Sequence, residues 1–334
     1  MDQYVRDLKR VVEVNYDITI FDIIKFKNVY KISAVEGNFC LKQCKCKFDK
    51  FKYILDVLDY LKKQEFDNIL SIVETYSEEQ YIEFNDVYFY MTEWIESREL
   101  NYSNYYDIIR ASQNIGNFHN YTQGYKPSKN ILPDYRWMKW GDIFNLKLMD
   151  IISFKESLKY RSDLDIFDRI YLENADKNID LAKESIELLY KFEYEKIVKE
   201  HFEIGYICHH DLANHNVLID SKGKIYFIDF DYVILDTYLH DLGSFINRCL
   251  KLGSWNEYKL NLIINSYRDI KRLPKREILL TLSFILFPND FWQIGIQRYR
   301  ENIRWSDERF LKRLNRSEND KQDKTNFIKS IIFK

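Results

Sequence analysis

The pattern of apolar and polar positions changes near residue 100 of this 334-residue chain. Before that point, short runs alternate between apolar and polar residues and are separated by turn signals such as Glu36-Gly37-Asn38, which is typical of strands in a sheet. In 50–63, apolar residues recur instead at steps of three and four, which predicts an amphipathic helix. Strands are expected at 18–20, 29–35, 39–41, 69–73, 81–84 and 87–91, and a short helix is expected at 2–14.

From about Asn101 onward the helical period dominates. An island from His209 to Asp231 breaks it, because two short apolar runs there flank Ser221-Lys-Gly223 and predict a hairpin. Polar residues crowd both sides of this hairpin, so chemistry is most expected there. Helices are expected at 103–120, 163–200, 238–252, 256–271, 276–287 and across most of 290–332.

Composition excludes several classes of protein. The chain has 9 Gly and 4 Pro, where average usage would give roughly 23 and 17, so collagen-like and linker-rich disordered classes do not fit. Fifty basic residues against fifty-two acidic ones give a net charge of −2, which argues against a nucleic-acid partner. The longest mostly apolar run, Ile278 to Phe287, is too short to span a membrane, and the first residues lack the apolar core of a signal peptide.

The cysteines do not suggest a disulfide framework or a zinc site. Their number is odd and their spacing uneven, and Cys44-Lys-Cys46 lacks the second ligand pair that zinc requires. We therefore expect structural thiols. Three of the five share the parity of Lys42, so a continuous strand would place them on the same face as that lysine: Cys40, Cys44 and Cys46.

The island carries the strongest chemical signal. His209-His-Asp211-Leu-Ala-Asn-His-Asn216 fits the pattern H-x-D-x-x-x-x-N, and Asp229-Phe-Asp231 follows the hairpin as a D-F-x motif. In phosphoryl transfer, such a carboxylate accepts the proton of the acceptor hydroxyl, while an amide and a second carboxylate hold magnesium. Lys42, in Phe39-Cys-Leu-Lys42, matches a strand lysine that reaches the phosphates. Together these signals predict a kinase-like fold.

Each residue also has a plainer interpretation. Lys42 could be a solvated edge residue, Asn216 a loop cap and Asp229 a turn former. A transition-metal site is the main chemical alternative, because imidazoles and carboxylates lie close together in the sequence, namely His209, His210, His215, Asp211 and Asp229. The ordered occurrence of Lys42, Asn216 and Asp229 favours the kinase interpretation.

Two departures from the protein-kinase pattern favour kinases of small molecules. All nine glycines fall at or after residue 37, so there is no G-x-G-x-x-G loop, and the backbone of 27–29 would have to cover the phosphates. Few residues separate Asp229 from Asp241, and no A-P-E motif follows, which leaves little room for an activation segment. Both features point to the branch that contains aminoglycoside and choline kinases.

Several longer segments resemble the CotS-type spore coat proteins, and the similarity covers about 15–332. The resemblance implies an α+β, bilobal, protein-kinase-like fold with a β-rich nucleotide-binding lobe at 1–95 and a helical lobe at 96–334 that carries the catalytic loop and the acceptor site. It also implies synthesis in the mother-cell cytoplasm and assembly into the endospore coat beside other coat proteins. The segments are Trp94-Ile-Glu-Ser-Arg-Glu99, Cys208 to Leu218, Ile228 to Tyr232, Asp236 to Leu242 and Phe287-Pro-Asn-Asp-Phe-Trp292.

The same resemblance implies the roles of individual residues. Asp211 would be the catalytic base, Asn216 and Asp229 would bind Mg²⁺, and Lys42 would contact the α- and β-phosphates of ATP. Lys42 would pair with an acid on the helix 50–63, either Asp56 or Asp59.

Four further residues would support the nucleotide or the loop. Glu93 and Trp94 would lie in the connection between the lobes where adenine binds, with core packing as the plainer role for Trp94. His209 and Asp241 would brace the catalytic loop.

Two functions are consistent with these features. The first is an ATP- and Mg²⁺-dependent phosphotransferase that acts on a hydroxyl of a small molecule. The second is a non-catalytic coat protein that keeps the kinase fold, and Mg-ATP affinity separates the two. The sequence does not identify the acceptor; acidic residues in 125–200 could receive a cationic acceptor, but solvated helix faces explain them equally well.

Overall fold

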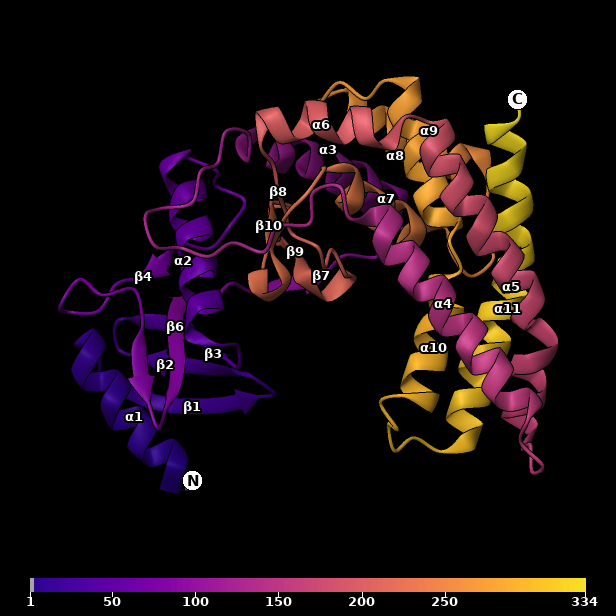
Figure 1. Cartoon of the computed structure of the whole chain (residues 1–334). Coiled ribbons are helices and arrows are strands. Elements are labelled where there is room, and N and C mark those ends of the chain that lie inside the picture. Colours follow the sequence, from indigo (N-terminus) through magenta and orange to yellow (C-terminus); the bar gives the residue numbers. More distant parts are fainter. Residues whose placement is uncertain (1–2) are drawn as a thin grey trace.

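The computed structural model describes residues 3–334, which form two lobes (Figure 1). The N-terminal lobe holds a six-stranded antiparallel sheet of order β1-β2-β3-β6-β4, with β5 paired to β6. Its elements are α1 (Gln3–Tyr16), β1 (Ile20–Phe26), β2 (Val29–Ala34), β3 (Gly37–Cys44), α2 (Phe48–Lys63), β4 (Ile72–Val73), β5 (Ile82–Phe84) and β6 (Val87–Glu93).

The two faces of this sheet have different coverings. Alternate residues of the strands, such as Tyr30, Ile32 and Leu41, are buried in a small core that they share with Leu8 and Val12 of α1. The opposite parity, to which Lys42 belongs, faces α2 and the second lobe. The apolar side of α2 joins the large core of the C-terminal lobe, so α2 ties the sheet to that lobe.

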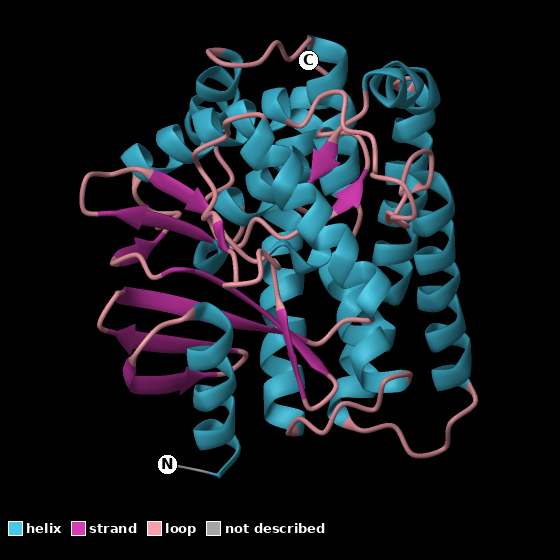
Figure 2. Ribbon diagram, turned by 90° about the vertical axis from the view of Figure 1, so that its left-hand side faces the viewer, coloured by secondary structure: helices cyan, strands magenta, loops and turns pink. Residues whose placement is uncertain are grey.

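The chain crosses between the lobes directly after β6. It continues into β7 (Ser97–Glu99), which pairs with β9 (Val217–Asp220), and β9 forms the expected hairpin with β10 (Ile225–Phe227). A two-stranded pair, β8 (Ile207–Cys208) and β11 (Ile234–Leu235), lies beside it. The segment 209–216, which we expect to form the catalytic loop, is therefore held between short strands within a helical lobe (Figure 2).

Helices build the rest of the C-terminal lobe, as the periodicity predicts. They are α3 (Tyr105–Tyr121), α4 (Trp140–Lys159), α5 (Ile166–Lys191), α6 (Tyr194–Ile204), α7 (Leu239–Leu250), α8 (Glu257–Arg268), α9 (Lys275–Leu286), α10 (Asn289–Tyr299) and α11 (Asp307–Ile332). The stretch Lys275–Tyr299 is long and apolar enough to cross a membrane by length and composition, yet 61% of its apolar window is buried inside the protein. It comprises α9 and α10, which meet at Pro288.

Three local expectations need correction. The helix expected at 163–200 is interrupted, because Glu193 adopts a left-handed conformation with φ of 56° between α5 and α6. Helix α4 was not expected, although its buried Phe144, Leu148 and Ile151 recur at helical spacing. Cys44 and Cys46 are joined as a disulfide rather than kept as free thiols, since their Cα atoms lie only 5.6 Å apart at the end of β3.

Candidate active site

A cavity of about 400 Å³ lies between the lobes, and we call it the interlobe cavity. Its walls come from β2, β3, β6, the lobe connection and the β9–β10 hairpin. Five predicted site residues line it: Lys42, Glu93, Trp94, Asn216 and Asp229. The other lining residues are mostly apolar, and among them are Val29, Leu58, Ile69, Leu70, Tyr90, Ile95, Leu218, Phe227 and Phe230.

Lys42 is buried at the inner end of this cavity. Its Nζ donates to Asp229 Oδ1 at 2.6 Å and to Asp231 Oδ1 at 2.5 Å. Burial by itself would lower the pKa of Lys42, but the nearby Tyr90, Asp231 and Asp229 outweigh it and raise the pKa. Burial would likewise raise the pKa of Asp229, yet the Lys42 ammonium holds it below the usual value. Lys42 and Asp229 are therefore both charged at neutral pH.

The expected pairing of Lys42 with an acid on α2 is wrong. Asp56 accepts hydrogen bonds from the Tyr125 hydroxyl at 2.5 Å and from the Ser128 backbone N–H at 3.3 Å, and thus faces away from the cavity. Asp59 forms an ion pair with Lys63 one turn along the same helix. The residue of α2 that lines the cavity is Leu58, which has no charge to offer.

Asp211 is held by two side chains that together fix the orientation of its carboxylate. Asn216 Nδ2 donates to Asp211 Oδ2 at 3.0 Å and to the Asp211 carbonyl at 2.9 Å. Arg248 of α7 donates to Asp211 Oδ1 at 2.7 Å. Arg248 was not predicted, because nothing in the local sequence links position 248 to the loop.

His209 and Asp241 make the contacts that a bracing role requires. Both oxygens of the buried Asp241 accept backbone N–H groups of the loop, from His209 at 2.6 Å and from His210 at 2.8 Å. His209 Nε2 donates to the Ile228 carbonyl at 2.9 Å, which leaves Nδ1 to accept the Asp211 N–H at 3.3 Å. Burial lowers the pKa of His209, in keeping with a neutral ring in this arrangement.

The lobe connection forms the outer wall of the interlobe cavity. The backbone N–H of Trp94 donates to the Asn38 carbonyl at 2.9 Å, which ties the connection to the start of β3. Lys31 Nζ lies 4.6 Å from the centre of the Trp94 ring. Within residues 3–334, the neighbouring Ile95 N–H makes no hydrogen bond. The side chains of Glu93 and Trp94 both contribute to the lining.

The three histidines of the island are directed to different places. His209 is buried beneath the loop, the His210 ring packs against His240 at 4.6 Å, and His215 lines the interlobe cavity. Over the part of the chain that the structure describes, no three His, Cys, Asp or Glu side chains form a group that could hold a metal ion. The arrangement therefore gives no support to the transition-metal alternative.

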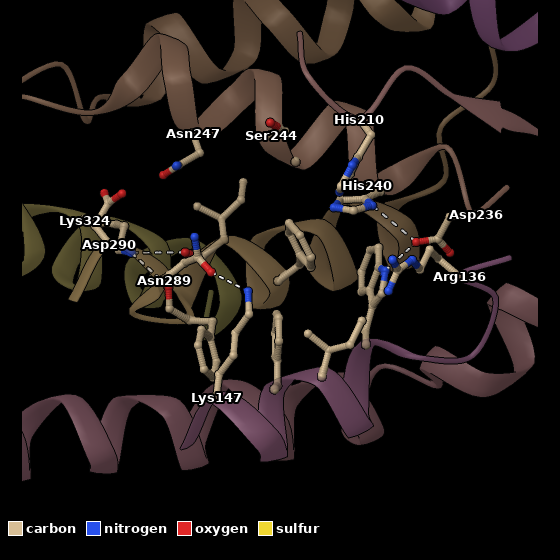
Figure 3. A pocket seen from close by; sticks show the side chains of 17 residues that line it. Arg136, Lys147, His210, Asp236, His240, Ser244, Asn247, Asn289, Asp290 and Lys324 are labelled. Atoms are coloured by element: carbon tan, nitrogen blue, oxygen red, sulfur yellow. Dashed lines mark hydrogen bonds and ion pairs between the residues drawn. The ribbon is translucent and has the colours of Figure 1, made fainter. Parts of the chain in front are cut away.

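A second cavity of about 400 Å³ lies inside the C-terminal lobe, and we call it the helical cavity (Figure 3). It adjoins the expected catalytic loop, because His210, next to Asp211, lines it and the hydroxyl of Ser244, another lining residue, lies 3.5 Å from Arg248 Nε. Its remaining lining residues come from distant parts of the chain, and among them are Arg136, Trp140, Phe144, Lys147, Asp236, His240, Asn247, Phe284, Asn289, Asp290 and Lys324.

Comparisons with known proteins agree with this geometry. Spore coat protein S of Bacillus subtilis (strain 168) is 21% identical over 307 residues, which cover 91% of this chain and 87% of that protein. An aminoglycoside phosphotransferase from Alicyclobacillus acidocaldarius has a similar crystal structure, with a TM-score of 0.85 at 19% identity over 96% of this chain and 94% of the other. Spectinomycin phosphotransferase, solved with ADP and spectinomycin, gives a TM-score of 0.70 at 15% identity over 98% of each chain.

These likenesses confirm the predicted bilobal α+β kinase-like fold. The family model described as "Spore coat putative kinase YutH" matches residues 9–331, nearly the whole chain. The chain therefore belongs to this family of spore coat proteins with an aminoglycoside phosphotransferase-like fold.

Proposed function

We propose that this protein is an ATP- and Mg²⁺-dependent phosphotransferase that phosphorylates a hydroxyl group of a small molecule in the spore coat. The observation that supports this most is the position of Asp211. Its carboxylate lies in the loop that separates the interlobe cavity, with its lysine and acids, from the helical cavity. On either side of Asp211 in the sequence, His210 lines the helical cavity and Asn216 lines the interlobe cavity.

The interlobe cavity suits a nucleotide. Its apolar walls would bury the adenine, and the Ile95 N–H, which has no partner among residues 3–334, would be available to it. Lys42 would bind the α- and β-phosphates, exchanging its carboxylate partners for phosphate oxygens. Because there is no glycine-rich loop, the backbone of the β1–β2 turn next to Val29 would cover the phosphates.

The residues present also fit a magnesium ion. The amide nitrogen of Asn216 is committed to Asp211, so its oxygen is the free atom, and Asp229 adds carboxylate oxygens to the same wall. Asn216 and Asp229 would hold the ion, which supplies positive charge to the transferring phosphoryl group. Asp211 is then left to act as the base.

In the proposed reaction, the acceptor oxygen attacks the γ-phosphorus and the bond to the β–γ bridging oxygen breaks, so that ADP leaves. Asp211 accepts the proton of the acceptor hydroxyl. Arg248 and Asn216 each hold one oxygen of Asp211, and each oxygen keeps a lone pair for that proton. The carboxylate is therefore oriented in advance, which is what positioning by a rigid loop contributes.

The test is the variant Asp211→Asn, with ADP release measured in the presence of small molecules extracted from sporulating cells. Turnover should fall by about a hundredfold to ten-thousandfold, the range typical of a lost general base. Calorimetry should show unchanged Mg-ATP affinity, and the exposed Asp163→Asn should behave as the unmodified protein. Unchanged turnover in Asp211→Asn would exclude this role for Asp211.

A non-catalytic coat protein is the second candidate. It is favoured by the fact that Lys42 and Asp211 already have charged partners, in Asp229, Asp231 and Arg248. If these ion pairs are purely structural, Mg-ATP will not displace them. Absence of binding at millimolar Mg-ATP would then select the structural role.

A further inference from the structure

The helical cavity has two ends of different character (Figure 3). Arg136, His210, Asp236 and His240 gather at one end, and Lys147 and Lys324 converge on the other, beside Asn289 and Asp290. Aromatic side chains also line the cavity and pack against one another, with ring centres of Trp140 and Phe284 4.3 Å apart and those of Phe144 and Phe287 4.2 Å apart. A small molecule with an apolar body and charged or polar ends would match this shape.

The carboxylates that line the cavity are already engaged. Asp236 is buried, accepts from Trp140 Nε1 at 2.9 Å and from the Thr237 N–H at 2.7 Å, and lies 3.3 Å from His240 Nδ1. Asp290 forms an ion pair with Lys251 at 3.4 Å. These are the two acids among the residues that line the cavity, and both already accept hydrogen bonds or an ion pair from protein groups.

The two lysines, in contrast, keep hydrogen-bond donors free, while the charges of Asp290 and Asp320 act on Lys324 from a longer distance. Lys147 Nζ donates to Asn289 Oδ1 at 2.6 Å, and Lys324 Nζ donates to the carbonyls of Ile285 and Phe287 at 3.2 and 3.3 Å. Within residues 3–334, no carboxylate lies within 4.0 Å of either ammonium group. Because an ammonium group has three N–H donors, two remain on Lys147 and one on Lys324.

We infer that the acceptor carries an anionic group, a carboxylate or a phosphate ester, which Lys147 and Lys324 bind at the end of the helical cavity lined by Asn289. This inference rests on the proposed function, since it places the acceptor's hydroxyl toward Asp211. It differs from the cationic acceptor that the sequence left open, because both acids that line this cavity already accept hydrogen bonds or an ion pair from the protein, whereas the two lysines keep free donors. Hydrogen bonds from ammonium to an anionic oxygen are among the stronger polar contacts.

Covalent labelling tests the inference without requiring turnover. Pyridoxal 5′-phosphate and pyridoxal carry the same aldehyde, but only the first is a phosphate ester. A lysine amine attacks the aldehyde carbon, water leaves to give an imine, and added borohydride reduces the imine to a stable secondary amine. The modified lysines are located by mass spectrometry, with Mg-ADP present to shield Lys42.

The expected result is a preference for the phosphorylated reagent at Lys147. The preference is the extent of labelling by pyridoxal 5′-phosphate relative to that by pyridoxal. The preference at Lys147 is divided by the preference at Lys159, an exposed lysine of the same helix. This ratio should be about ten or more, the size expected for hydrogen bonds to a charged group. Lys324→Met should reduce this ratio severalfold, whereas Lys329→Met, outside the cavity on the same helix, should leave it unchanged. A ratio near one in the unmodified protein would overturn the inference. An unchanged ratio in Lys324→Met would also overturn it, once the melting temperature shows that this variant is folded.

Protection identifies the kind of anion. D-gluconate supplies a carboxylate, sn-glycerol 3-phosphate supplies a phosphate ester, and choline and myo-inositol are the cationic and neutral controls. We expect one or both anions to slow the labelling of Lys147, and equal or better protection by choline would overturn the inference. The outcome is separate from that of the proposed function, whose failure would appear as absent Mg-ATP binding.

Discussion

Lys42 and Lys147 each line a cavity beside the expected catalytic loop, but only Lys42 has carboxylate partners. Lys42 lies between two carboxylates, which raise its pKa despite burial. Lys147 has no carboxylate partner within residues 3–334, and burial lowers its pKa to about 8. The interlobe cavity thus has one ammonium group already paired with two carboxylates, whereas the helical cavity has positive charge still open to a ligand. The first suits phosphates together with a metal ion, and the second suits an anion alone.

The largest effect on stability is expected for Asp241, which holds the loop between the two cavities. Asp241→Asn replaces one acceptor oxygen by an NH₂ group that faces a buried backbone N–H, so the free energy of unfolding should fall by about 3 kcal/mol. Urea denaturation measures this change. A loss below about 0.5 kcal/mol, the usual size of a surface substitution, would show that Asp241 does not hold the loop.

The same residue gives a pH dependence. Burial would raise the pKa of Asp241, but His119 and the neighbouring imidazoles hold it below the usual value. A carboxyl with a depressed folded-state pKa contributes stability above its unfolded pKa, and this contribution is lost as the pH falls through the folded value. The unmodified protein should therefore lose more stability than Asp241→Asn when the pH is lowered below about 4. Parallel curves for the two proteins would contradict the assignment.

Removing Lys42 should have the next largest effect. Lys42→Met leaves Asp229 and Asp231 close together without a counter-charge, and the free energy of unfolding should fall by about 2 kcal/mol, because both acids are partly exposed to solvent. Adding Asp231→Asn to Lys42→Met should restore part of the loss in a double-mutant cycle. Strict additivity of the two changes would show that the cluster is not coupled.

The helical cavity gives a weaker prediction, which concerns the dependence of stability on pH. Since the pKa of Lys147 is lowered from 10.5 to about 8, the unfolded chain binds more protons between these values, and stability should rise with pH in that window. The gain should be about 1 kcal/mol, reduced by the access of solvent to the cavity. Lys147→Met should remove this rise in thermal unfolding scans, whereas Lys159→Met should retain it. An unchanged slope in Lys147→Met would mean that the lysine is solvated like an exposed one.

The smallest effect is expected on α2. Asp59→Asn removes only a solvent-exposed pair with Lys63, so stability should hardly change, and Mg-ATP affinity should change by less than about twofold. Calorimetric titration of this variant checks the corrected partner of Lys42. A large loss of Mg-ATP affinity would mean that Asp59 does pair with Lys42.

The interlobe cavity could be largely predicted from the sequence, and the helical cavity could not. Asp211, Asn216 and Asp229 lie close together along one loop and hairpin, so their spacing encodes their geometry. Lys42, in contrast, is far from its partners in the sequence. The residue of α2 that lines the same cavity is the uncharged Leu58, and Lys42 pairs instead with Asp231, which only tertiary packing brings close.

The lining of the helical cavity is scattered over distant helices, and no local pattern marks it. Lys147 comes from α4, Asn247 from α7, Phe284 from α9 and Lys324 from α11. Exposed apolar residues such as Leu146 also blur the period of α4. The chemistry of this cavity therefore follows only from packing.

Calorimetric titration of Mg-ATP into the full-length protein and into Lys42→Met tests the central claim most directly. If the interlobe cavity is a nucleotide site built around Lys42, the unmodified protein should bind with a dissociation constant below about 1 mM, and Lys42→Met should bind at least about tenfold more weakly. No heat of binding at millimolar Mg-ATP, or equal affinity in the two folded proteins, would contradict the claim.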